Sequence, residues 1–308
     1  MKDKILVTGA NGNLGKKFIL SKGEVDVCAL VRSEKAKDDL MSFVQAHDIQ
    51  DVQIVKCDYL DEQVIKELAR SCRYMLHLVG IIKENKDNRF DVVHKQTTKA
   101  LVEAIKGSGI KKCCYISILG AKEGSENTCF SSRRFAEKLF LDSDMPSLVL
   151  QVPMVLGEGD HACEALKKNA LSRINFTFRK LSLEQPIYTK DIIDVINIDI
   201  NRTLKENHSS IGIKALAGPT SLTREKLIMK AAKQLGVKVK VFSLPLFLGH
   251  TLARICEMLF SHPPITRAML GVLDHDDDID PLPSSKELGI NLTTLDEMLE
   301  ATLSAYKN

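Results

Sequence analysis

Short runs of apolar residues alternate with helical patterns over the first half of the chain. Most of these runs are continuously apolar, as expected of strands in a parallel sheet whose two faces are both covered by helices. The expected strands are 4–8, 25–31, 52–56, 74–79, 112–117 and 147–152, and the expected helices are 13–22, 34–47, 61–70, 90–107 and 131–142. This alternation predicts an α/β fold with a Rossmann-type, doubly wound parallel sheet and right-handed crossovers.

The pattern becomes less regular after residue 153. Thr223 and Thr294 precede helical patterns, and we expect them to be N-caps. Helices are expected at 161–171, 190–205, 223–235, 245–260 and 294–306, and short strands at 186–189, 212–217 and 238–242. Since no repeat or low-complexity linker separates the halves, we predict a dinucleotide-binding domain at 1–152. A smaller substrate or partner lobe at 153–308 would pack on it and share some elements with its core.

Composition narrows the range of functions. The net charge is +3 and the basic residues are scattered, so the sequence gives no reason to expect nucleic acid binding. The eight cysteines form no C-x-x-C pair, and no zinc spacing is present, so we expect reduced core thiols and no metal site. No separate apolar signal segment precedes the first strand, and no stretch reaches the ~20 uncharged residues of a spanning helix. We therefore expect a cytoplasmic protein.

One stretch leaves two alternatives open. Residues 244–260 are apolar but interrupted by Pro245, His250, Arg254 and Glu257. They predict a helix packed on the lobe, and a peripheral contact with a membrane surface or a quinone tail is the alternative.

The strongest motif follows the first strand, where glycines stand at the first, fourth and seventh positions of a turn that leads into a helix. The first glycine makes a tight turn, the second leaves room for a pyrophosphate, and the third lets helix and strand approach closely. The N–H groups and the dipole of the helix N-terminus then favour the phosphates. The residues expected to bind the dinucleotide here are Gly9, Asn11, Gly12, Asn13, Leu14 and Gly15.

The end of the second strand indicates which dinucleotide is bound. An acidic residue there would accept a hydrogen bond from the ribose 2′-OH of NAD, whereas this strand ends in Arg32. A guanidinium can pair with a 2′-phosphate, so we expect NADP(H), with NAD as the alternative. Arg32 as a solvated surface residue is the competing interpretation. Asp58, after the third strand, is placed to reach the adenine, or else caps a turn.

The glycine turn resembles that of the short-chain dehydrogenase/reductase superfamily, in particular its extended and atypical branches. Further landmarks occur in order at 77–80, 115–121, 155–160 and 186–191. The chain is most similar to the NmrA-like group and the group of NADPH-binding complex I accessory subunits, with 217–223 and 263–266 in support. The resemblance implies that Val79 and Gly80 pass the nicotinamide ribose and that Ser117 is the active-site serine.

The family's usual reductases carry Tyr-x-x-x-Lys in the helix after the fifth strand. The tyrosine acts as the acid, and the lysine lowers its pKa and holds the ribose. The helical pattern places Phe130 at the tyrosine position and Arg134 at the lysine position. A shift by one residue gives Cys129 and Arg133, or Ser131 and Phe135, and restores neither residue.

The substitution separates binding from chemistry. Phe130 has no proton to give, whereas Arg134 keeps a charge that can hydrogen-bond the ribose. Ser117 could orient a carbonyl or could be a buried serine bonded to the backbone. Tyr188, His94 or a water could replace the missing acid.

Two functions follow from this pattern. The first is an NADP(H)-binding sensor, assembly factor or structural protein that has lost hydride chemistry. The second is an atypical NADPH-dependent oxidoreductase or isomerase that acts on a small carbonyl, a quinone or an isoprenoid-like molecule. A sugar-nucleotide epimerase or dehydratase is disfavoured, because those relatives need the same tyrosine.

Overall fold

The computed structural model describes residues 2–206 and 210–304. Seven parallel strands form the main sheet in the order β11-β6-β5-β4-β1-β2-β3. They are β1 (Lys4–Thr8), β2 (Asp26–Val31), β3 (Val52–Lys56), β4 (Tyr74–His77), β5 (Lys112–Ile118), β6 (Ser147–Val152) and β11 (Gly212–Ala215). The predicted Rossmann-type doubly wound sheet is therefore confirmed.

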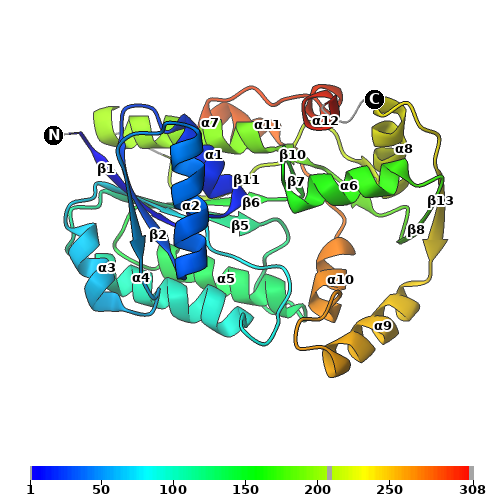
Figure 1. The fold of residues 1–308 in the computed structure, drawn as a ribbon, viewed down its shortest axis with the longest axis horizontal. Coiled ribbons are helices and arrows are strands. Elements are labelled where there is room, and N and C mark those ends of the chain that lie inside the picture. Colours follow the sequence, from blue (N-terminus) through cyan, green and yellow to red (C-terminus); the bar gives the residue numbers. More distant parts are fainter. Residues whose placement is uncertain (1, 207–209, 305–308) are drawn as a thin grey trace.

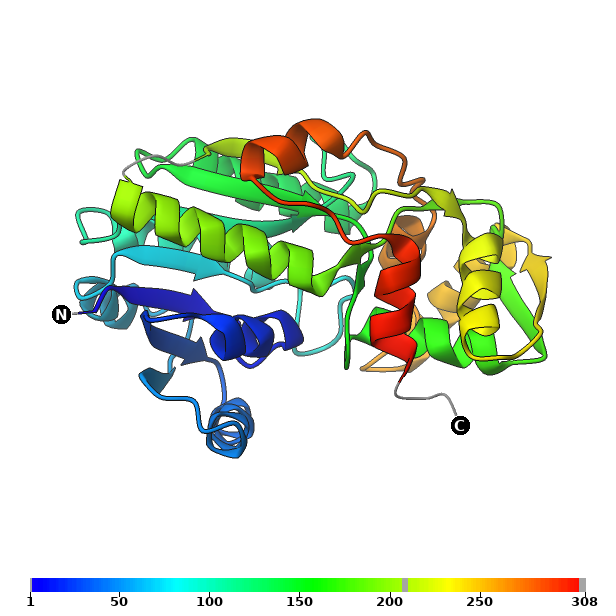
Figure 2. The same ribbon diagram turned by 90° about the horizontal axis from the view of Figure 1, so that it is seen from above.

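Helices cover both faces of this sheet (Figures 1 and 2), and its inner strands bury apolar side chains on both sides. One core contains buried side chains of α1, α2 and α7, and the other contains those of α3, α4 and α5. The helices are α1 (Asn13–Ser21), α2 (Glu34–Ala46), α3 (Glu62–Ala69), α4 (Thr97–Ile105), α5 (Thr128–Leu141) and α7 (Thr189–Asn201). Two π-helical segments, Asp91–Gln96 and Arg202–Glu206, precede α4 and follow α7.

The second half forms a lobe beside the carboxyl ends of the strands (Figure 1). Its core is made by α6, α8 and α12. Its helices are α6 (His161–Leu171), α8 (Arg224–Gln234), α9 (Leu246–Leu259), α10 (Arg267–Leu273), α11 (Leu282–Leu288) and α12 (Leu295–Leu303). Its strand pairs are β7 (Val155–Leu156) with β10 (Ile187–Tyr188), β9 (Leu183–Glu184) with β12 (Leu222–Thr223), and β8 (Ile174–Phe178) with β13 (Lys240–Leu244).

The two halves share their core. β11 pairs with β6 at the edge of the main sheet, and α7 packs with α1 and α2. Both predicted caps are confirmed: the Thr223 side chain accepts a hydrogen bond from the N–H of Lys226, and Thr294 forms a capping box with Glu297. Strand β8 and helices α10 and α11 were not predicted. They are five or seven residues long, and segments this short show no clear period.

A buried ion pair fastens α7 to the sheet. Lys112 Nζ lies 2.6 Å from Asp199 Oδ1, and the Tyr74 hydroxyl donates to Asp199 Oδ2 at 2.5 Å. The eight cysteines are all buried and unpaired, as expected of core thiols. Within residues 2–206 and 210–304, none of the helices combines the length and the apolar character that crossing a bilayer requires.

Candidate dinucleotide site

The glycine turn has the geometry that a dinucleotide needs. Gly9 has φ +72°, and a Cβ at this position would lie 3.1 Å from the Val79 nitrogen, so the turn runs directly past the end of β4. A Cβ on Gly15 would lie 2.5 Å from the carbonyl oxygen of Ala10, which shows how closely α1 approaches the turn. Each of these two positions therefore requires glycine for a different reason.

Gly12 is the N-cap of α1 and has no side chain to cap the helix. Among the described residues, no acceptor is found for the N–H groups of Asn13, Leu14 and Gly15. Unpaired N–H groups at the positive end of a helix dipole are the usual ligands of a pyrophosphate. The residues present therefore fit a dinucleotide.

The side chains of this turn have other partners. Asn13 Nδ2 donates to Asp160 and, at 3.3 Å, to the Glu158 carbonyl oxygen. Lys17 pairs with Glu158 at 2.8 Å, so the 157–160 turn of the lobe lies beside the glycine turn. Leu14 packs on the core. Asn13 and Leu14 thus offer backbone groups and not side chains to a phosphate.

Tyr59, which we did not predict, braces the turn. Its hydroxyl accepts from the N–H of Gly9 at 3.0 Å and donates to the carbonyl oxygen of Leu30 at 2.8 Å. Burial raises the pKa of Tyr59 to about 12. Its neighbour Asp58 is exposed, and one of its carboxylate oxygens accepts from the Leu60 N–H at 3.0 Å. Asp58 therefore caps a turn, which was the alternative to adenine binding in the sequence analysis.

Arg32 is exposed at the end of β2, and its guanidinium donates to Asn88 Oδ1 at 2.6 Å. None of the described carboxylates pairs with Arg32. Asn88 lies in a turn that Asn85 organises by accepting from the N–H groups of Asp87 and Asn88. The guanidinium therefore has only a neutral partner, which a phosphate could replace.

Arg133 is the guanidinium that lies against Gly80. A Cβ on Gly80 would overlap the guanidinium group of Arg133. Arg133 is buried and donates to the Tyr115 hydroxyl at 3.0 Å and to the carbonyl oxygen of Ile116 at 3.1 Å, while its Nε has no acceptor among the described residues. A buried cation with an unpaired donor and no carboxylate partner is costly unless a ligand completes its hydrogen bonds.

This arrangement differs from our expectation, which assigned the position to Arg134. Residues four apart share a helix face, and the face of α5 turned toward Gly80 and Ile81 carries Arg133 and Cys129, whose Sγ lies 3.6 Å from the Ile81 oxygen. Arg134 instead pairs with Glu137 at 3.1 Å. Phe130 is buried, and its ring meets that of His275 in the lobe at 5.4 Å.

Ser117 is at the end of β5, as expected, and is buried. Its hydroxyl donates to Glu137 Oε1 at 2.5 Å, and Gln151 Nε2 donates to the same oxygen at 2.8 Å. A hydroxyl that donates its proton to a carboxylate has no proton left for a substrate carbonyl. Ser117 is thus bonded to a side chain and not, as one of our two interpretations had it, to the backbone.

The suggested replacement acids have partners too. His94 Nε2 accepts from the Ile81 N–H at 3.1 Å, and Nδ1 lies 2.8 Å from Ser132 Oγ. Burial, with a smaller contribution from the charge of Arg133, lowers the pKa of His94 to about 2. The Tyr188 hydroxyl donates to Glu158 Oε1 at 3.1 Å, and burial raises its pKa to about 12. Neither group is poised to transfer a proton near pH 7.

An apolar cavity of about 300 Å³ lies in the lobe. Ile82, after β4, and Met154, after β6, connect it to the carboxyl edge of the main sheet. Its other apolar lining residues include Leu166, Phe178, Leu227, Leu246, Met269 and Leu270.

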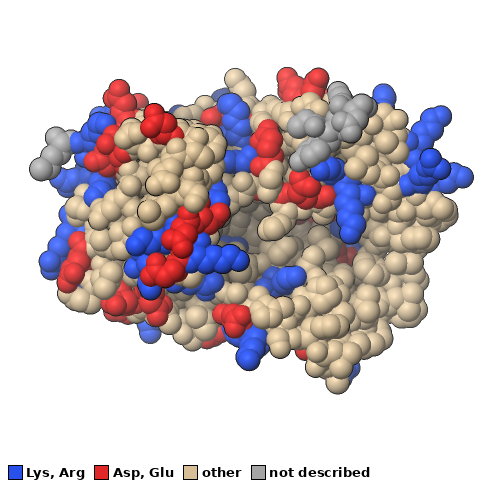
Figure 3. Space-filling view, in the orientation of Figure 1, with Lys and Arg blue, Asp and Glu red and all other residues tan. Residues whose placement is uncertain are grey.

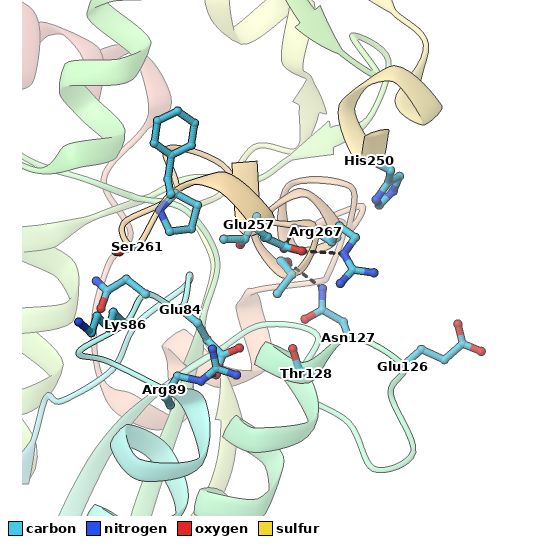
Figure 4. Close-up of a pocket in the computed structure, with 16 residues that line it drawn as sticks. Glu84, Lys86, Arg89, Glu126, Asn127, Thr128, His250, Glu257, Ser261 and Arg267 are labelled. Carbon is cyan, nitrogen blue, oxygen red and sulfur yellow. Dashed lines mark hydrogen bonds and ion pairs between the residues drawn. The ribbon is translucent and has the colours of Figure 1, made fainter. Parts of the chain in front are cut away.

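A second, polar cavity of about 930 Å³ opens between the 84–89 loop, the start of α5 and helices α9 and α10 (Figure 4). Its charged groups are largely paired with one another: Arg267 Nε lies 2.9 Å from Glu257, and Arg89 Nε lies 3.3 Å from Glu84. None of the glycine-turn residues lines it.

The fold and the glycine turn together are those of a Rossmann-type dinucleotide-binding protein. Solved structures of similar fold include an NADPH-dependent quinone oxidoreductase of Escherichia coli in complex with NADPH, with TM-score 0.70, 20% identity, and coverage of 96% of this chain and 98% of that one. A UDP-glucuronic acid 4-epimerase of Bacillus cereus in complex with NAD also has TM-score 0.70 and 20% identity, covering 99% of this chain and 96% of that one. These similarities concern the fold.

Residues 1–151 match the NmrA-like family. A ceramide reductase of Caulobacter vibrioides is 27% identical over 51% of this chain, and the match spans 47% of that protein, about half of its length. The mitochondrial NADH dehydrogenase (ubiquinone) 1 alpha subcomplex subunit 9 of Mus musculus is 20% identical over 94% of this chain and 77% of its own length. Over residues 1–151 and in its fold, the chain is similar to the NmrA-like group of atypical short-chain dehydrogenases/reductases.

Proposed function

We propose that this chain is an NADP(H)-binding protein that acts as a sensor, assembly factor or structural partner, without the proton-coupled hydride transfer of ordinary reductases in its superfamily. Arg133 is the observation that carries the binding part. Its buried guanidinium lies against Gly80, close to the carboxyl end of β4, and among the described residues its Nε has no acceptor and the group has no carboxylate partner. Bound dinucleotide would supply ribose hydroxyls as acceptors at this place.

The described groups near Gly80 and the end of β5 lack a proton donor suited to hydride transfer. Whichever residue of α5 replaces the tyrosine, Phe130 or Cys129, that position of the helix carries no phenol, and burial raises the pKa of the Cys129 thiol to about 11. The Ser117 hydroxyl is directed to Glu137. When bound, the cofactor supplies a hydride, but none of the described groups named here is placed to supply the accompanying proton.

Arg32 supports NADP(H) over NAD(H). It is the cation nearest in sequence to the end of β2, and its present partner, Asn88, is neutral. A 2′-phosphate would form a charge-assisted contact with the same guanidinium. The preference for NADP(H) and the cytoplasmic location expected from the sequence both stay predictions.

The apolar cavity motivates the second candidate, an atypical NADPH-dependent oxidoreductase or isomerase. Its lining suits a small hydrophobic, quinone-like or isoprenoid-like molecule. A nucleotide sugar fits poorly, because the two arginines in this lining are already paired. Arg179 lies 2.6 Å from Asp274, and Arg224 lies 2.6 Å from Glu184, so neither charge is free for a diphosphate.

Neighbouring arginines allow a matched test. Calorimetric titration with NADPH should show at least tenfold weaker binding for Arg133→Met than for wild type, which is about 1.4 kcal/mol. Arg134→Met, which removes a partly exposed guanidinium, should bind within about twofold of wild type, because this guanidinium pairs with Glu137 and does not lie against Gly80. Circular dichroism of each variant verifies that it is folded.

Three results would count against the proposal. Wild type that binds no nicotinamide dinucleotide would refute the binding function. If only Arg134→Met binds NADPH more weakly, then Arg134 and not Arg133 contacts the ribose, as predicted from the sequence. NADPH oxidation by wild type in the presence of a quinone or aldehyde, well above the protein-free rate, would establish the oxidoreductase alternative.

A further inference from the structure

Exposed apolar side chains are concentrated in one part of the lobe. About half of the large apolar side chains that are exposed in the described chain belong to β8, β13 and α9 and the residues that follow them. We name them the apolar face: Ile174, Phe176, Leu181, Phe242, Phe247, Leu248, Leu252, Ile255, Met258, Leu259 and Phe260. Met258 is 77% exposed and Leu259 is 72% exposed, which is unusual for side chains of this size on a helix that has a buried side.

The apolar face is continuous. The rings of Phe176 on β8 and Phe242 on β13 stack with their centroids 5.7 Å apart. Helix α9 packs on the end of β8 through its small residues, since a Cβ on Gly249 would lie 3.0 Å from the ring of Phe178. Gly249, Ala253 and Cys256 are the buried residues of α9, and its larger apolar side chains are exposed, except for Leu246, which lines the apolar cavity.

The charged residues in and near β8, β13 and α9 are almost all basic. Residues 165–183 contain five Lys or Arg and no Asp or Glu, and residues 226–256 contain six Lys or Arg and no Asp or Glu. Arg173, Lys238, Lys240 and Arg254 are exposed, and none of them pairs with an acid among the described residues. Glu257, the acid that follows, accepts from the backbone N–H and the Nε of Arg267.

Figure 3 shows the same separation. Basic side chains gather over α8 and β13 at the upper right, and the surface over α9 and α10 at the lower right is largely without charge. The apolar face therefore adjoins a basic rim.

We propose that the apolar face binds the surface of a bilayer that contains anionic phospholipids. α9 has 14 residues, too few to span a membrane but enough to lie in the interface with Phe247 and Met258 among the acyl chains. The rim lysines and arginines then meet the lipid phosphates. A second copy of the chain is disfavoured as the occupant, because self-association would bring two sets of unpaired cations together.

Vesicle flotation tests this surface. Wild type should float with phosphatidylcholine vesicles that contain about 30% phosphatidylglycerol, and less in high salt, since the rim contacts are screened. Phe247→Asp with Met258→Asp should lower the bound fraction at least tenfold. Lys238→Glu with Lys240→Glu should do the same, because each reversal removes an attraction and adds a repulsion.

The matched control is Leu282→Asp on α11, because Leu282 and Phe247 are each 67% exposed. This variant should float as wild type does. All variants should titrate with NADPH as wild type does, so that failure to bind lipid is distinguished from failure of the dinucleotide site.

Wild type that does not bind these vesicles, or α9 variants that bind them as well as wild type does, would overturn the proposal. So would light scattering that shows a wild-type dimer without vesicles and a monomer for Phe247→Asp, because the apolar face would then be an interface between two copies.

Discussion

Two buried histidines should make the stability of the Rossmann core depend on pH. His77 Nδ1 lies 2.6 Å from Thr8 Oγ1, and His94 Nε2 accepts from the Ile81 N–H. Burial, with the charge of Arg133 as a further cause, lowers the pKa of His77 to about 3 and that of His94 to about 2. Both imidazoles are therefore neutral in the folded protein, while their ordinary value of 6.5 applies after unfolding.

The sign of the effect follows from this depression. Below pH 6.5 the unfolded chain takes up protons that the folded chain does not, so acidification favours unfolding. The stabilising contribution is fully present above that value and is lost as the pH falls toward the folded pKa values. Each histidine changes the free energy of unfolding by up to about 1.4 kcal/mol per pH unit once the unfolded imidazole is fully protonated, and by about 1 kcal/mol between pH 6.5 and 5.5, where it is only partly protonated. The pair should therefore cost about 2 kcal/mol over this interval. That is a substantial part of a typical stability of roughly 5–15 kcal/mol.

Urea unfolding of the dinucleotide-free protein, followed by circular dichroism from pH 7.5 to 5.5, measures this loss. His94→Asn removes one of the two groups and should halve the change of unfolding free energy with pH, whatever its own stability. His161→Gln, at an exposed position, should leave the pH dependence as in wild type. If wild type keeps its unfolding free energy down to pH 5.5, or His94→Asn keeps the full slope, the histidines are not held neutral and the reasoning fails.

The other predictions concern the cofactor turn, its specificity and the core. Gly12→Val should fold, because the new Cβ meets only the Gly9 oxygen at 3.2 Å, but should bind NADPH at least tenfold more weakly in a calorimetric titration; a folded variant that binds normally would contradict the site. Wild type should prefer NADPH to NADH by a charge-assisted contact worth roughly 1.5–3 kcal/mol, and Arg32→Glu should abolish that preference. Equal wild-type affinities for the two nucleotides would refute this role of Arg32. Asp199→Ala should lower the free energy of urea unfolding by about 3–5 kcal/mol, because Lys112 would be left buried without its carboxylate; a loss below about 1 kcal/mol would contradict the contribution assigned to this pair.

The elements of the first half could be predicted because their signals are local. A strand that is covered on both faces is largely apolar, so the bounds of β1 and β6 agree with the apolar runs of the sequence. The glycine spacing likewise reports the conformation of one short turn. In the lobe, β8 pairs with β13, which lies more than 60 residues later, and half-exposed apolar residues there carry no signal for their partner.

Side-chain partners were decided by packing. The pattern of α5 allows more than one register, and the helical period alone could not say which of two adjacent arginines faces Gly80. The answer depends on the orientation of α5 against β4 and β5, in which Arg133 donates to the Tyr115 hydroxyl and to the Ile116 carbonyl oxygen. The hydrogen bond from Ser117 to Glu137, which lies 20 residues later in the sequence, depends on the same packing of α5 on β5. The sequence by itself determined the class of fold, the cofactor turn and the absence of the usual tyrosine, because each of these resides in neighbouring residues. The tertiary structure alone decided which charges and hydroxyls remain unpaired, because a hydrogen bond forms only between groups that the fold brings into contact.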